Sequence, residues 1–312
     1  MSAQGWKKLI GFGKMQIPFT KYSKIYYVFS GILILGAVVS LFLFGLKFGI
    51  EFTGGSVIEV EFQTERPSNE IIEKSLSDFN LGEVVLQPMG QKEMLLKMKE
   101  IDETVHQKII SKLKEISPFE EKRFELIGPA IGQELKQKTE VAIILALVAI
   151  TLYIAFAFRK ISRPIPSWQY GVASLVALFH DILIPLGIFS ILGKFYNVEI
   201  TIPIIAALLT ILGFSVHDTI IIFDRIRENI LKKSFFSFEE TVNWSLNQTL
   251  GRSINTVLSV LIVVFAIFFF GGETLKYFAL SLIVGIVSGA YSSIFIASPI
   301  LVSWLKRKER KR

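Results

Sequence analysis

Long apolar runs alternate with polar segments along this 312-residue chain. A helix needs roughly 20 apolar residues to cross the hydrocarbon core of a bilayer, and six runs reach or approach that length. Too little polar chain remains to surround so many apolar helices in water, so the pattern predicts an all-α membrane bundle. The six predicted transmembrane helices cover residues 25–47, 138–158, 165–193, 199–223, 252–272 and 274–305.

Residues 48–137, between the first two spans, have the periodicity of a soluble domain. Residues 56–62 alternate like a strand, and residues 68–80 place their apolar side chains on one face of a helix. The remaining predicted elements are strands at 83–88, 93–98 and 122–127 and a helix that Asp102 caps. The order βαββαβ predicts a small α+β domain of ferredoxin-like topology.

Nothing in residues 48–137 indicates catalysis. Their one histidine, His106, lies on an amphipathic helix, and we expect it to be a solvated surface residue. The domain serves either as a docking or substrate-handling surface or as a spacer, and the residues alone leave both interpretations open.

Charge predicts the orientation in the membrane. The net charge is +7, but residues 51–140 are acidic, with 18 Asp and Glu against 12 Lys and Arg. Basic residues gather before the first span, between the second and third, within 224–251, and in the tail 306–312. Because cytoplasmic loops carry the excess of Lys and Arg, residues 1–24 and the tail are predicted to be cytoplasmic and the α+β domain extracytoplasmic. A nucleic-acid partner is not expected. The tail is predicted to anchor the last span and to meet membrane lipid.

Two carboxylates interrupt the apolar runs. An ionised Asp inside a membrane helix costs about 2.5–3.5 kcal/mol on insertion scales, so Asp181 in the third span and Asp218 in the fourth are candidate functional residues. The fifth span opens with a polar stripe at helical spacing, formed by Arg252, Asn255, Thr256 and Ser259. We expect Arg252 and Asp218 to form an ion pair. His217 and Thr219 flank that carboxylate.

Three interpretations of this pair stay open: coupling to protons, a static pair that fixes helix packing, or binding of another ion. For Asp181, capping by the adjacent His180 competes with a functional role. In the last span, Ser281, Gly285, Gly289 and Ser293 recur every fourth residue, which favours close helix packing within the chain.

Several segments of the chain form recognisable motifs. The most specific is GFSVHDTIIIFDRIREN at 213–229, which includes Asp224, Arg225 and Arg227. Further elements are GIEFTGG at 49–55, IGPAIGQEL at 127–135, HDILI at 180–184 and RSINT at 252–256. Together, and in their order along the chain, these segments resemble the SecF family of bacterial protein-export membrane proteins. Glu51 precedes the glycines Gly54 and Gly55 where the family usually has Asp, and His217 stands where Asn is common. The second departure leaves the coupling ion, proton or sodium, undecided.

The resemblance implies an accessory subunit of the Sec translocase, in the cytoplasmic (inner) membrane of a bacterium. It implies a six-helix, RND-like half that works with SecD, the SecYEG channel and possibly YajC. Such a subunit uses the proton-motive force to promote translocation of unfolded preprotein. The family's intramembrane aspartate and arginine fall on Asp218 and Arg252. We expect Asp181 and His217 to take part in ion coupling as well.

Two other functions compete with this one: an RND-type half-transporter for lipid or small molecules, and an uncoupled membrane scaffold. An enzyme, a cofactor and a bound metal are not expected, because no nucleotide loop, nucleophile elbow or metal-ligand spacing is present. Gly54 and Gly55 are predicted to form a turn rather than a phosphate cradle.

Overall fold

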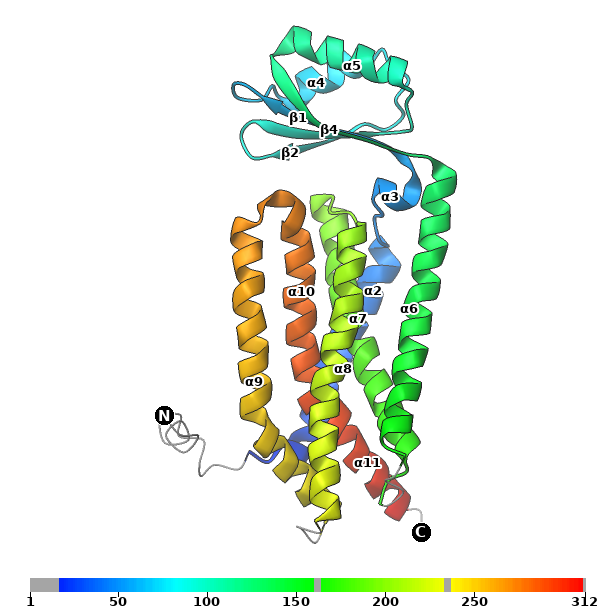
Figure 1. Cartoon of the computed structure of the whole chain (residues 1–312), viewed down its shortest axis with the longest axis vertical. Coiled ribbons are helices and arrows are strands. Elements are labelled where there is room, and N and C mark those ends of the chain that lie inside the picture. Colours follow the sequence, from blue (N-terminus) through cyan, green and yellow to red (C-terminus); the bar gives the residue numbers. More distant parts are fainter. Residues whose placement is uncertain (1–16, 160–163, 233–236, 311–312) are drawn as a thin grey trace. The chain divides into compact units, whose positions relative to one another are not determined.

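The computed structural model describes residues 17–159, 164–232 and 237–310 (Figure 1). It divides into two compact units. Over the described residues, the helical unit lies within Met1–Gly45, Leu145–Ile191 and Ala206–Arg312, and the sheet unit comprises Leu46–Ile144 and Leu192–Ile205.

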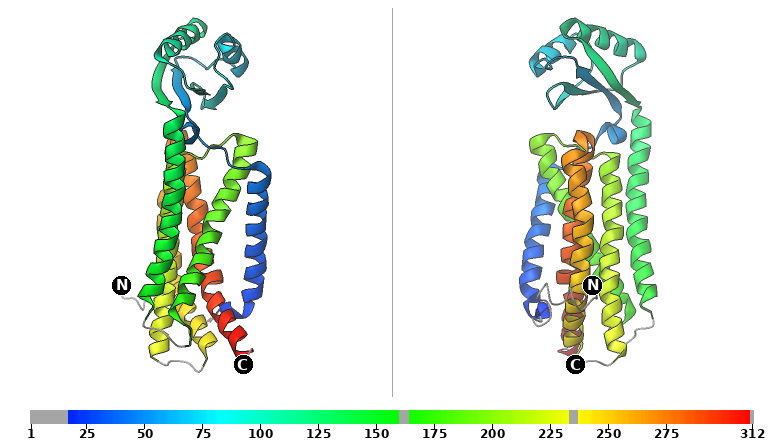
Figure 2. Two further views of the ribbon diagram at one scale, coloured as in Figure 1. Left: turned by 90° about the vertical axis from the view of Figure 1, so that its right-hand side faces the viewer. Right: turned by 60° about the vertical axis from the view of Figure 1, so that its left-hand side comes forward.

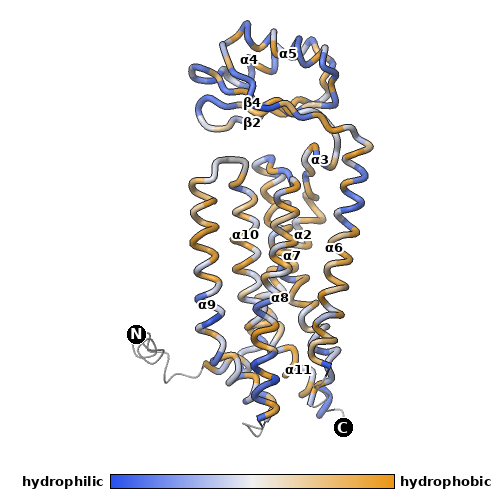
Figure 3. The backbone as a smooth tube through the Cα atoms, in the orientation of Figure 1, coloured by the Kyte–Doolittle hydropathy of each residue, from blue (hydrophilic) through white to orange (hydrophobic). Residues whose placement is uncertain are grey.

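Within the described ranges, six helical stretches are long and apolar enough to cross a membrane. They are η1 with α2 (Phe19–Tyr22 and Ser23–Phe44), α6 (Pro129–Ala157), α7 (Ser167–Tyr196), α8 (Ile202–Leu231), α9 (Phe238–Phe270), and a last span built from α10 (Gly272–Ser292), a π-helical turn (Ser293–Ala297) and α11 (Ser298–Glu309). Figure 3 shows the apolar residues that run along them. The predicted six-helix bundle is confirmed.

The helices continue beyond the apolar runs. Residues 224–251, predicted as a loop, are helical at both ends, because α8 extends to Leu231 and α9 already begins at Phe238. A capping box starts α9: the Ser237 hydroxyl accepts from the Glu240 amide, and the Glu240 carboxylate accepts from the Ser237 amide. Polar residues can thus extend a helix past the hydrocarbon core. A hydropathy pattern does not predict these extensions, because it detects only the apolar part of the helix.

Helix α8 packs closely against the last span through small residues. A Cβ on Gly285 would collide with Ile211, and one on Gly289 would lie 3.0 Å from the Ser215 Cβ. One turn further along, the hydroxyls of Thr219 and Ser293 are 2.8 Å apart. Both helices therefore advance by four residues per contact in the same direction, and the predicted packing stripe is used within the chain. Helices α9 and α10 also lie side by side (Figure 1), and Figure 2 gives two further views of the helices.

The sheet unit has the predicted βαββαβ order. Its elements are α3 (Ile50–Thr53), β1 (Gly55–Phe62), α4 (Asn69–Leu76), β2 (Val85–Met89), β3 (Glu93–Met98), α5 (Glu103–Ile116) and β4 (Phe119–Ile127). In the described part of the chain these four strands form one antiparallel sheet in the order β2-β3-β1-β4. The Asp102 carboxylate accepts from the Val105 amide at 2.8 Å, which confirms the predicted cap.

The expectation for His106 was wrong. Its side chain is buried and stacks on Phe124, with ring centroids 3.9 Å apart. Its Nε2 lies 2.9 Å from the Glu121 carboxylate, so the imidazole is held by packing and by hydrogen bonding. An i, i+3, i+4 pattern treats a histidine as polar, whereas its ring can cover the edge of a core.

Candidate functional site

Asp181 lies at the centre of a buried polar cluster that joins three spans. Its Oδ2 accepts from Ser215 of α8 at 2.6 Å and from Ser292 of α10 at 2.7 Å. Its Oδ1 accepts from Ser288 of α10 at 3.1 Å and lies 3.0 Å from His180 Nδ1. All five side chains are buried. These residues, here called the Asp181 cluster, supply hydrogen-bond donors to both carboxylate oxygens.

The π-helical turn links this cluster to the neighbourhood of Asp218. Ser292, at the end of α10, donates to Asp181, while the next residue, Ser293, pairs with Thr219. The Ser298 hydroxyl donates to the Ser293 carbonyl across the turn at 3.1 Å. Single π-turns inside α-helices are frequent at functional sites, and the turn here follows directly on two adjacent hydroxyls, Ser292 on Asp181 and Ser293 on the residue after Asp218.

Asp218 is in the opposite situation to Asp181. It is 1% exposed, yet among the described residues neither of its carboxylate oxygens has a hydrogen-bond partner. The groups that act on it are the charge of His217 and the buried hydroxyl of Ser253, whose contact with the carboxylate falls short of full hydrogen-bond geometry. A buried carboxylate without a well-formed hydrogen bond favours its protonated form or needs a transient partner. Asp218 is therefore suited to gain and lose a charge.

The predicted ion pair between Asp218 and Arg252 is not formed. On α9 the side chain that points into the bundle at this level is Ser253, which is 1% exposed. Adjacent residues of a helix point about 100° apart, so the neighbouring Arg252 lies on an exposed face. The rest of the predicted stripe has the same orientation: Asn255 and Ser259 are exposed and Thr256 is half-buried. The stripe therefore exists, but it faces away from this chain's own bundle.

His217 is exposed as well, on the face of α8 opposite to its packing against α10. The same face carries Ala206, Thr210 and Gly213, all exposed. Within the chain, the close packing of α8 is made on another face, where Ile211 meets Gly285.

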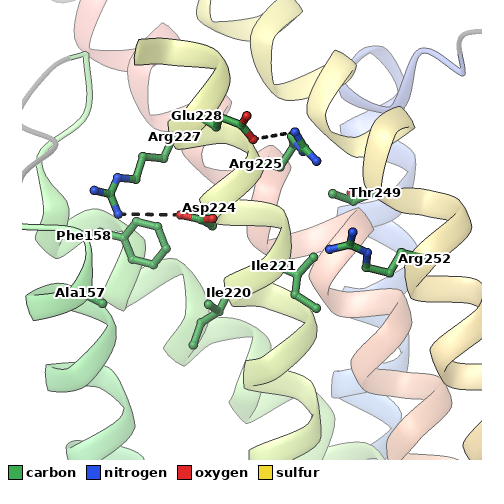
Figure 4. A pocket seen from close by; sticks show the side chains of 10 residues that line it. All are labelled: Ala157, Phe158, Ile220, Ile221, Asp224, Arg225, Arg227, Glu228, Thr249 and Arg252. Carbon is green, nitrogen blue, oxygen red and sulfur yellow. Dashed lines mark hydrogen bonds and ion pairs between the residues drawn. The ribbon is translucent and has the colours of Figure 1, made fainter. Parts of the chain in front are cut away.

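Arg252 lines a pocket of about 260 Å³ between α6, α8 and α9 (Figure 4). The same pocket is lined by the family-motif residues Asp224, Arg225 and Arg227. Arg225 pairs with Glu228 at 2.6 Å, and Arg227 lies 3.8 Å from Asp224. Ile221, one turn before Asp224 on α8, forms part of the wall.

The glycine pair at the start of the sheet unit is a turn, as predicted. Gly54 and Gly55 both have positive φ, +76° and +140°. A Cβ on Gly54 would lie 2.7 Å from the Pro129 Cα, and one on Gly55 would lie 2.7 Å from the Met98 carbonyl oxygen. Only glycine fits this conformation and approach. Burial raises the pKa of the preceding Glu51 above its ordinary value, and the nearby carboxylates of Glu199 and Glu125 raise it further.

The sequence pattern does not identify the serines that lie beside the two carboxylates. Ser288 and Ser292 lie four residues apart on α10, next to the small-residue stripe, and Ser253 directly follows Arg252. Their spacing marks a shared helix face, but a serine in a membrane helix signals close packing as readily as hydrogen bonding. No three acidic or histidine side chains of the described ranges gather as metal ligands.

Comparisons with known proteins agree with this architecture. Residues 108–307 match the family model of the protein export membrane protein SecD/SecF, C-terminal, and residues 39–65 match the SecD/SecF GG motif. The protein translocase subunit SecF of Thermobaculum terrenum is 43% identical, over 92% of this chain and 94% of its own. That of Desulfurispirillum indicum is 39% identical, over 93% and 92%.

Solved structures give the same result. The chain is similar to SecDF of Thermus thermophilus, described as a translocon-associated membrane protein, with a TM-score of 0.83 and 33% identity over 94% of this chain. SecDF in a super-membrane-facing form gives a TM-score of 0.70 and 32% identity. The chain spans 39% and 40% of those two chains. By sequence and by structure, this chain belongs to the SecF branch of the SecD/SecF family.

Proposed function

We propose that this chain is an accessory subunit of the Sec translocase that works with SecD and uses the proton-motive force to promote preprotein translocation across the cytoplasmic membrane. The observation that carries the proposal is Asp218, a carboxylate buried among apolar helices with no hydrogen-bond partner in the described part of the chain. Moving one charge through 100 mV releases about 2.3 kcal/mol, enough to bias two helix arrangements that differ by a few kcal/mol.

Two outward-facing polar surfaces support a membrane partner. The stripe that begins at Arg252 on α9 and the small face around Gly213 on α8 are exposed in this chain. Lipid tails cannot form hydrogen bonds with such groups, whereas the polar side chains of a second membrane protein can. A six-helix SecD half would cover these faces and would bring its own polar groups to Arg252. SecYEG, and YajC where present, complete the proposed assembly, with both termini in the cytoplasm.

In the proposed cycle, Asp218 gains a proton from one side of the membrane and loses it to the other. Protonated, it is compatible with its apolar site. Ionised, it draws in water or a cation, and Arg252 is the nearest candidate cation on α9. The accompanying helix displacement moves the sheet unit, which handles emerging preprotein.

The test is Asp218→Asn in cells whose only copy is the variant, with export of a slow secretory substrate as the readout. We expect export to fall to the level of cells that lack the chain. Glu239→Gln is the matched control, because Glu239 is a cytoplasmic carboxylate paired with Lys306 at 2.6 Å, away from the buried site. Normal export by the Asp218 variant would refute ion coupling and leave the uncoupled scaffold as the function.

A further inference from the structure

The connection between α7 and α8 belongs to the sheet unit. Residues Leu192–Ile205 form one compact body with Leu46–Ile144. The Ile200 amide donates to the Lys47 carbonyl at 2.7 Å, and the Gly49 amide donates to the Ile200 carbonyl at 2.9 Å. This one-residue parallel bridge, Phe48 opposite Ile200, fastens the connection to the chain that leads into the Gly-Gly turn.

Side chains reinforce the bridge on both sides. Lys97 of β3 pairs with Glu199 at 2.7 Å, and their side chains are only 14% and 17% exposed. The Lys47 ammonium donates to the Asn197 amide oxygen at 2.6 Å, and Asn197 has a φ of +54°, the left-handed conformation of a tight turn. A partly buried ion pair is screened less than a surface pair and has fewer alternative positions.

Lys97 is also the cation among several carboxylates. The charges that act on Glu51 are those of Glu199, Lys97 and Glu125. Removal of Glu199 would leave Lys97 with other acidic neighbours. Removal of Lys97 would instead leave Glu51 and Glu199 without this cation, whereas Glu125 keeps Arg123 at 3.4 Å. The two halves of the pair are therefore not equivalent.

We infer that Lys97 and Glu199 are positioning residues that lock the α7–α8 connection to strand β3, so that displacement of α7 and α8 is transmitted to the sheet. Both helices carry a buried carboxylate, Asp181 on α7 and Asp218 on α8, and they meet in this one segment. The inference rests on the proposed function, since it names the route by which the ion site would move the domain that handles preprotein.

The first experiment separates transmission from folding. Lys97→Met should lower export about fivefold, the smallest effect typical of coupling between sites, and Glu199→Gln should lower it less. The charge-swapped pair Lys97→Glu with Glu199→Lys should restore much of it. Proton uptake that depends on Asp218, measured in vesicles that contain the SecD partner, should persist in Lys97→Met. Normal export by Lys97→Met, or loss of proton uptake together with export, would overturn the inference.

A crosslink tests whether the lock stays closed during the cycle. The chain has no cysteine, so Lys97→Cys with Glu199→Cys introduces the only thiols. We expect a short bifunctional maleimide to join them and to restore export relative to the untreated pair. Failure to crosslink, or a further loss of export on crosslinking, would contradict a lock that stays closed.

Asp218→Asn in the same assays distinguishes the two proposals. If it exports normally, the proposed function fails. If it loses export while Lys97→Met does not, the proposed function stands and the lock alone is refuted.

Discussion

Removal of the Asp181 carboxylate should destabilise the helical unit far more than removal of a buried hydroxyl beside Asp218. Asp181→Ala leaves the hydroxyls of Ser215, Ser288 and Ser292 without their acceptor. Hydrogen bonds between membrane helices contribute about 0.6–1.7 kcal/mol each, and bonds to charged groups lie at or above the top of that range. Three such bonds amount to roughly 3 kcal/mol, lessened where a serine turns to a carbonyl of its own helix, as Ser292 can with Gly289 at 3.1 Å.

Two further variants make this estimate discriminating. Asp181→Asn keeps the volume and one acceptor oxygen, so we expect a loss of about 1–2 kcal/mol. Ser253→Ala removes a hydroxyl whose contact with Asp218 falls short of full hydrogen-bond geometry, so we expect a change within about 0.5 kcal/mol. The assay is reversible unfolding in mixed detergent micelles, monitored by tryptophan fluorescence. An Asp181→Ala variant as stable as Ser253→Ala would refute the view that Asp181 holds α7, α8 and α10 together.

The remaining predictions concern packing and pH. Gly285→Leu should separate α8 from α10 and lower the unfolding free energy by about 1–3 kcal/mol, measured in the same micelles, because the new side chain would occupy the place of Ile211; Gly213→Leu, on the exposed face, is the control and should cost less. The raised pKa of Glu51 means that the folded state holds its proton more tightly than the unfolded chain. Stability of the sheet unit should therefore fall as pH rises above 4.5, the ordinary value, and Glu51→Gln should flatten that fall in thermal unfolding; an unchanged profile would contradict it. His106→Ala should lower the melting temperature of the sheet unit by several degrees because it removes the stack on Phe124, and a neutral effect would place the ring outside the core.

Local patterns determined the parts of the fold that depend on neighbouring residues in the sequence. The alternation at 93–98 coincides with β3, and Asp102 caps α5, because strand period and helix capping are set within a few residues. Six spans follow from length and hydropathy alone. These features needed no knowledge of what lies across the bundle.

The site was predicted less completely, because helical spacing gives a stripe but not its direction. Arg252, Asn255 and Ser259 share a face, and a polar face on an oily helix can meet its own bundle or a partner. The structure turns Ser253 inward instead. The hydroxyls around Asp181 come from helices far apart in the sequence, so only tertiary packing identifies them as its donors.

The central claim, that Asp218 couples the ion gradient to transport, is tested most directly by the gradient dependence of export in vesicles that contain this chain, its SecD partner and the channel. Export is timed with and without an imposed proton gradient, for the native chain and for Asp218→Asn. The account predicts that the gradient accelerates export only when Asp218 is present. Equal acceleration in the variant would contradict it.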